Sequence, residues 1–210
     1  DVVDVVIDRN ARQATITVSA PHETPAAPSQ NLADITALGA DWWPLKMARE
    51  LDDAILMLRT NELDIGIWLL KTRGNAELAL AVDASLASHQ DHWFVREVIG
   101  MLRRTLARLD VSSRTLFALI ETGSCFAGTL LELALAADRS YMLDDAKRPV
   151  AMAVGIMNGG SLPMSHGLSR LQARFAGDPE REEWVAALRG PLDVAQAADA
   201  GLVTVVGTDA

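Results

Sequence analysis

One stretch constrains this chain of 210 residues more than any other: an apolar run at residues 116–120, a glycine-containing loop, and a second apolar segment at 128–138. The first run is short enough for a buried strand, and the second contains strong helix formers with apolar side chains on nearly every face. The first N–H groups of a helix have no internal partner, and the dipole adds about half a positive charge there. The stretch therefore predicts a strand, a loop and a buried helix whose N-terminal amides face a negatively charged ligand.

Glu132 is the only charged residue between Glu121 and Asp138. Burial would raise the pKa of its carboxyl and suit it to proton transfer near neutral pH. Residue types alone leave a second reading equally open, in which Glu132 only complements the helix N-terminus or faces solvent.

The composition is that of a globular protein, with 50% hydrophobic and 22% charged residues, and the length suits one sizeable core. A net charge of −9 leaves no electrostatic footprint for nucleic acid. No apolar run approaches the roughly 20 residues of a membrane span, and the chain does not open on a signal peptide. One cysteine excludes an internal disulfide framework. We therefore expect a cytoplasmic protein without nucleic-acid or membrane partners.

The rest of the chain alternates strand and helix patterns. Residues 3–7 and 14–18 alternate apolar and polar side chains around a polar turn, which predicts a β-hairpin. A helix is predicted at 45–59 and a buried strand at 65–70. A short strand is predicted at 141–143, a buried strand and loop at 150–157, and helices at about 161–175 and 178–188. His89, Asp91 and His92 have only weak metal-ligand spacing, so no metal site is predicted. These elements predict a single α/β domain over residues 1–210.

Two motifs resemble the crotonase (enoyl-CoA hydratase/isomerase) superfamily. Residues 132–138 read Glu-Leu-Ala-Leu-Ala-Ala-Asp after a glycine loop, and residues 195–203 carry the family's spaced alanines before Gly-Leu-Val. More narrowly, residues 120–129 resemble the benzoyl-CoA-dihydrodiol lyase family. The resemblance implies a crotonase-like spiral of repeated ββα units without the C-terminal helical association region. It also implies that the chain is a segment of a longer protein, which forms a homo-oligomer based on dimers or trimers.

The resemblance implies an acyl-CoA ligand whose thioester oxygen is held by two backbone amides, an arrangement that stabilises developing negative charge. One amide would belong to Val82, although Ala81 stands where the family has glycine. The other would belong to Gly128 or Thr129, and the longer loop of this chain leaves that choice open.

Lys71 and Arg73 follow the strand predicted at 65–70. They are candidate contacts for the phosphates of CoA, and a solvated loop is the equally open alternative.

The second catalytic glutamate of the family would fall at Val150 or Ala151, and both are apolar. Glu121 offers a replacement, because ligands of α/β proteins bind where strands end. Two carboxyls in one cleft push their pKa values apart, so Glu121 and Glu132 are the candidate acid/base pair. Cys125 is either a third catalytic member or a small buried hydrophobe.

The function implied by the resemblance is that of a lyase that opens the ring of 2,3-dihydro-2,3-dihydroxybenzoyl-CoA, or of the matching epoxide, with water. The products would be an aliphatic CoA semialdehyde and formate, in aerobic benzoate degradation, without a cofactor besides the CoA of the substrate. The alternatives are an enoyl-CoA hydratase or isomerase and a non-catalytic acyl-CoA-binding domain.

Overall fold

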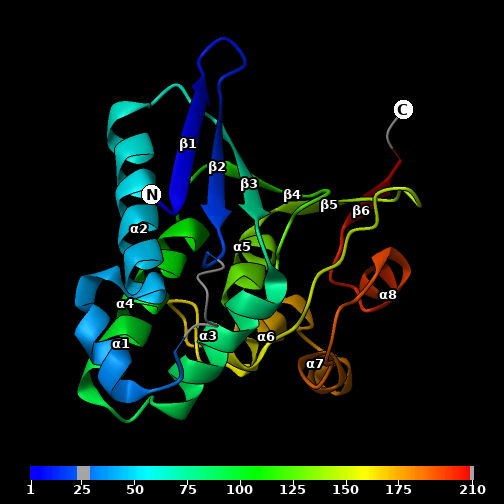
Figure 1. Ribbon diagram of the computed structural model, residues 1–210. Helices are drawn as coiled ribbons and strands as arrows, with labels where there is room; N and C mark the ends of the chain where they lie inside the picture. The colour runs from blue at the N-terminus through cyan, green and yellow to red at the C-terminus, as the bar shows by residue number, and fades with distance from the viewer. Residues whose placement is uncertain (23–28, 209–210) are drawn as a thin grey trace.

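The computed structural model describes residues 1–22 and 29–208. Its six strands form one sheet in the order β1-β2-β3-β4-β5-β6 (Figure 1). The predicted hairpin at the N-terminus is confirmed, since β1 and β2 pair antiparallel, and all later pairs are parallel. The strands are β1 (Val3–Asp8), β2 (Gln13–Ser19), β3 (Ile67–Arg73), β4 (Thr115–Ile120), β5 (Arg139–Leu143) and β6 (Val205–Gly207).

The two longest helices, α2 (Trp43–Asn61) and α4 (Trp93–Asp110), pack against each other beside the N-terminal half of the sheet (Figure 1). α2 contains the helix predicted at 45–59. The shorter helices are α1 (Leu32–Leu38), α3 (Ala76–Ser88), α5 (Leu131–Ala136), α6 (Arg170–Arg174), α7 (Pro179–Ala186) and α8 (Val194–Asp199), with 3-10 turns η1 (Gly39–Asp41), η2 (Gly128–Leu130) and η3 (Ile156–Gly159). In the described residues, no helix has both the length and the apolar character needed to cross a membrane.

The core lies between the helices and one face of the sheet. Alternate strand residues point to that face, as the pleat of a strand requires. Trp68 and Leu70 of β3, Ala118 of β4 and Met142 of β5 are all at most 1% exposed. The α/β prediction is therefore confirmed, and the elements that carry the candidate site are fixed by this core.

Two predicted elements differ from the structure. Residues 150–157 form only isolated bridges, Ala127 with Ala153 and Met152 with Leu192, before η3. The helix predicted at about 161–175 shrinks to α6, because Gly160 and Gly167 adopt positive φ angles that end regular structure. The second strand of each ββα unit is thus reduced to single bridges in this part of the chain.

Candidate functional site

The loop before α5 is held closed by the chain itself. After β4, the Glu121 amide donates to Ser124 Oγ at 3.0 Å and the Ser124 amide donates back to the Glu121 carbonyl at 2.9 Å. Gly123 takes a φ of +84°, which glycine adopts without steric cost. This turn leads the chain from the strand into η2 and α5, so the predicted order of strand, loop and buried helix is confirmed.

The amides predicted to hold a thioester oxygen already have partners. The Gly128 amide donates to the Ala153 carbonyl at 3.1 Å, and the Thr129 amide donates to Asp83 Oδ2 at 2.7 Å. Val82 lies inside α3, where an amide bonds the carbonyl four residues earlier. The oxyanion role of Val82 stays a prediction, and the structure places this residue within continuous helix.

Asp83 occupies the place where the sequence predicted a ligand. The Thr129 hydroxyl donates to its Oδ1 at 2.6 Å, in addition to the amide bond, and the carboxyl is 1% exposed. Burial raises the pKa of Asp83 to about 7, although the two bonds from Thr129 lower it in part. The negative group at the start of η2 and α5 is therefore a side chain of this protein.

The packing around Asp83 leaves little space for the thioester oxygen of a ligand beside the Asp83 carboxyl. A Cβ on Gly128 would overlap Asp83 Oδ2, and a Cβ on Gly155 would lie 2.7 Å from the Gly128 Cα. Gly128 has a φ of +53°. Glycine is thus required at both positions for close backbone approach, and the approach is to the chain itself.

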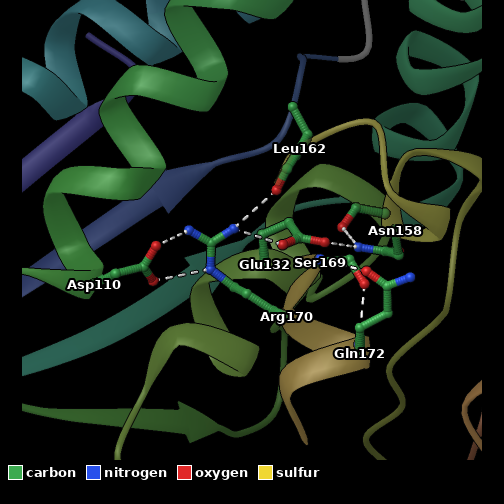
Figure 2. A network of polar contacts seen from close by, with 8 residues as sticks. Asp110, Glu132, Asn158, Leu162, Ser169, Arg170 and Gln172 are labelled. Atoms are coloured by element: carbon green, nitrogen blue, oxygen red, sulfur yellow. Dashed lines mark hydrogen bonds and ion pairs between the residues drawn. The ribbon is translucent and has the colours of Figure 1, made fainter. Parts of the chain in front are cut away.

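Glu132 lies in a buried ion-pair network (Figure 2). Arg170 Nη1 donates to its Oε2 at 2.9 Å, and Asn158 Nδ2 donates to its Oε1 at 2.6 Å. Arg170 also contacts Asp110 with two bonds, Nη2 to Oδ2 at 2.7 Å and Nε to Oδ1 at 3.1 Å. These four residues come from α4, α5, η3 and α6, so the network joins elements distant in sequence.

The network has one cation between two acids. The side chains of Arg170, Glu132 and Asp110 are 1%, 2% and 6% exposed. Burial raises the pKa of Glu132, and Arg170 and Asn158 oppose that rise; burial likewise raises the pKa of Asp110 against Arg170. Of the two readings of Glu132 that the sequence left open, the structure shows the buried carboxyl, and both of its oxygens contact neighbouring side chains.

Sequence reasoning missed Arg170 and Asn158 as partners of Glu132, and Asp110 as the second partner of Arg170. A charged residue in an apolar helix signals a buried partner, because an unpaired buried charge is costly. Nothing in the local pattern says which of the arginines supplies it. The uninterrupted helix-forming run around Ala81 was the available signal that Asp83 lies on a helix.

The other candidate catalytic residues lie in different surroundings from Glu132. Glu121 Oε1 contacts Lys71 Nζ at 2.7 Å, and the Glu121 side chain is 49% exposed. Cys125 is fully buried, its amide donates to Thr72 Oγ1 at 2.9 Å, and burial raises the pKa of its thiol. Within the described residues, no hydrogen bond or ion pair joins Glu121 to Glu132.

The two candidate CoA contacts, Lys71 and Arg73, have different bonding partners. Lys71 is engaged by Glu121, whereas Arg73 donates through Nε to Ser19 Oγ at 2.9 Å and lines a cavity of about 500 Å³ with His22.

The comparisons with known proteins agree with this geometry at the level of fold. No family model matches the chain. The chain is 55% identical over 208 residues to benzoyl-CoA-dihydrodiol lyase of Aromatoleum evansii, a match that covers 99% of the chain and 37% of that relative. It superimposes on an enoyl-CoA hydratase of Bacillus halodurans with a TM-score of 0.60 at 17% identity, covering 100% of the chain and 74% of the hydratase. An enoyl-CoA hydratase of Bacillus anthracis gives a TM-score of 0.60 at 18% identity, covering 99% and 70%.

Proposed function

We propose that this chain, which has the crotonase fold and is 55% identical to benzoyl-CoA-dihydrodiol lyase, is one domain of a ring-cleaving carbon–carbon lyase. The substrate of that enzyme is 2,3-dihydro-2,3-dihydroxybenzoyl-CoA or its epoxide, and the products are an aliphatic CoA semialdehyde and formate. The observation that carries the proposal is 55% identity maintained along 99% of the chain. The chain spans 37% of the relative's length, so the activity is proposed for the longer protein.

Within that enzyme, the geometry favours a non-catalytic role for this segment over the catalytic role that the motifs predict. Catalysis of the crotonase kind needs free amides at the thioester oxygen and a carboxyl that reaches the substrate. The amides of Gly128 and Thr129 and the carboxyl of Glu132 all bond within the chain instead. Asp83, Arg170 and Asn158 are the side chains that close this site.

The remaining features follow from the same proposal. The enzyme acts on a CoA thioester in the cytoplasm, needs no cofactor beyond the CoA of its substrate, and forms a homo-oligomer as the full-length protein. Arg73 and the cavity beside it are the part of this segment best suited to contact a phosphate of CoA.

The test is an assay of the full-length protein with dihydroxylated benzoyl-CoA, in which formate release is measured and crotonyl-CoA hydration is run in parallel. We expect formate and no hydration. Hydration without formate would replace the proposal with an enoyl-CoA hydratase, an alternative that Val150 and Ala151 disfavour because neither offers a second carboxyl. The absence of both formate release and hydration would contradict both enzymatic readings.

A further inference from the structure

The outer face of the sheet, opposite the core, carries apolar side chains over its parallel half. We define the outer apolar face as Ile67 and Leu69 of β3, Phe117 and Leu119 of β4, and Tyr141 and Leu143 of β5. Each alternates with a buried core residue, so all six point away from the helices. Five are half-buried against one another and Tyr141 is 36% exposed. The Phe117 and Tyr141 rings pack edge to face at 5.7 Å.

The antiparallel half of the same face is polar. Asp4 and Asp8 of β1 and Gln13, Thr15 and Thr17 of β2 point outward there, and Val6 is the apolar exception at 60% exposed. An antiparallel sheet commonly leaves one face in water, whereas parallel strands almost always have both faces covered. The sequence thus divides the face into a solvated half and a half suited to burial.

No helix of the described residues covers the outer apolar face, since the helices that contact the sheet lie on its other side (Figure 1). A groove of about 460 Å³ lies at the carboxyl ends of β4, β5 and β6, lined in part by Leu119, Tyr141 and Leu143 of the face and by Glu121 and Arg148 at its rim. Apolar surface of this kind, bordered by charge, is typical of an interaction site.

We propose that the outer apolar face is an interface within the full-length polypeptide, covered by the part of the protein that lies outside this segment. The support is the length of the relative: almost two thirds of it lies outside the matched residues, while 99% of this chain matches without a helix to cover the face. A second domain on the same chain is held at high effective concentration, so the apolar face is buried without a separate partner. The inference rests on the proposal that this chain is one domain of a longer enzyme.

The test is cysteine labelling, which suits this segment because its one natural cysteine, Cys125, is fully buried. Leu119→Cys places a thiol on the outer apolar face, Tyr141→Cys provides a second position, and Thr17→Cys is the matched control on the polar half. Each variant is reacted with a maleimide in the full-length protein, both in its native state and unfolded in urea. Labelling of the peptide that carries the new thiol is followed by mass spectrometry.

We expect the thiols introduced at positions 119 and 141 to be labelled more slowly by roughly tenfold or more in the native full-length protein than in the unfolded protein, independently of protein concentration, because a covered thiol reacts only on local opening. The control at position 17 should react equally in both. Equal labelling of all three positions in the full-length protein would overturn the proposal. Protection at positions 119 and 141 that grows with the concentration of the full-length protein would also overturn it, by assigning the face to a second copy. Formate release does not enter this readout, so the two proposals can fail separately.

Discussion

Replacing Arg170 with methionine tests whether the Glu132 network is structural. The substitution removes the cation that Glu132 and Asp110 share and keeps a long, flexible, apolar side chain in its place. Both carboxyls then stay in the interior with fewer partners, since Asn158 still donates to Glu132 at 2.6 Å.

Removing one partner of a buried ion pair costs about 3–5 kcal/mol, because the remaining charge is left in a medium of low dielectric constant. We expect a loss of that size in the free energy of unfolding at pH 8. At that pH each carboxyl must either stay ionised in the interior or bind a proton from a solution in which protons are scarce. Burial already raises the pKa of Glu132 and Asp110, and loss of Arg170 removes a group that lowers both. The folded variant therefore binds protons more tightly than its unfolded chain, so the loss should shrink as the pH falls to 5.

The assay is urea unfolding of the wild type and the variant at pH 8 and pH 5. Arg103→Met, at an exposed position of α4, is the matched control and should stay within about 0.5 kcal/mol of the wild type. A loss below about 1 kcal/mol at pH 8 for Arg170→Met would refute the reasoning, because such a value is typical of an exposed ion pair. Glu132 would then be free for another role.

Three further results are expected. The raised pKa of Asp83, about 7 against 3.8, means that stability should fall by on the order of 4 kcal/mol as the pH rises from 4 to 7, and Asp83→Asn should flatten that dependence in urea unfolding at each pH. Gly128→Ala should destabilise the fold by about 2 kcal/mol or more, because the new Cβ overlaps Asp83. Gly100→Ala, in an open helical position, should be neutral or stabilising by up to about 1 kcal/mol. Thermal unfolding of the two variants measures the difference, and equal effects would contradict the packing argument. Glu121→Gln in the full-length enzyme should leave formate release within about threefold, and a larger loss would restore Glu121 as a catalytic residue.

Much of the fold could be predicted because its signals are local. Alternation of apolar and polar residues at 3–7 and 14–18 predicted the hairpin, because successive side chains of a strand point to opposite faces. The short apolar run at 116–120 predicted β4 as a buried strand. The strand at 150–157 and the long helix after it could not be predicted correctly. Gly160 and Gly167 adopt positive φ angles there, which the apolar pattern does not indicate. The close approach of Gly155 to Gly128 is a contact between distant segments, which a local pattern cannot show.

The sequence could identify residues of the candidate site, but it could not identify the side chains that contact them. The motif placed Glu132 in a buried helix beside a glycine loop, and the structure agrees. The motif could not show which residues of distant segments contact each other. Asp83 and Thr129 are 46 residues apart, and Arg170 and Glu132 are 38 residues apart. Those two contacts decide whether the site is open to a thioester, and they depend on how α3 packs on η2 and α6 packs on α5.

The central claim is that the crotonase-type site of this segment is closed by its own side chains and does not perform the chemistry of the enzyme. The most direct measurement is the rate of formate release from dihydroxylated benzoyl-CoA by full-length Glu132→Gln, with circular dichroism to establish that the variant is folded. The account predicts a rate within about threefold of the wild type, because the residue acts only in the fold. A folded variant that loses activity by about 100-fold or more, as removal of a general acid or base does, would contradict it.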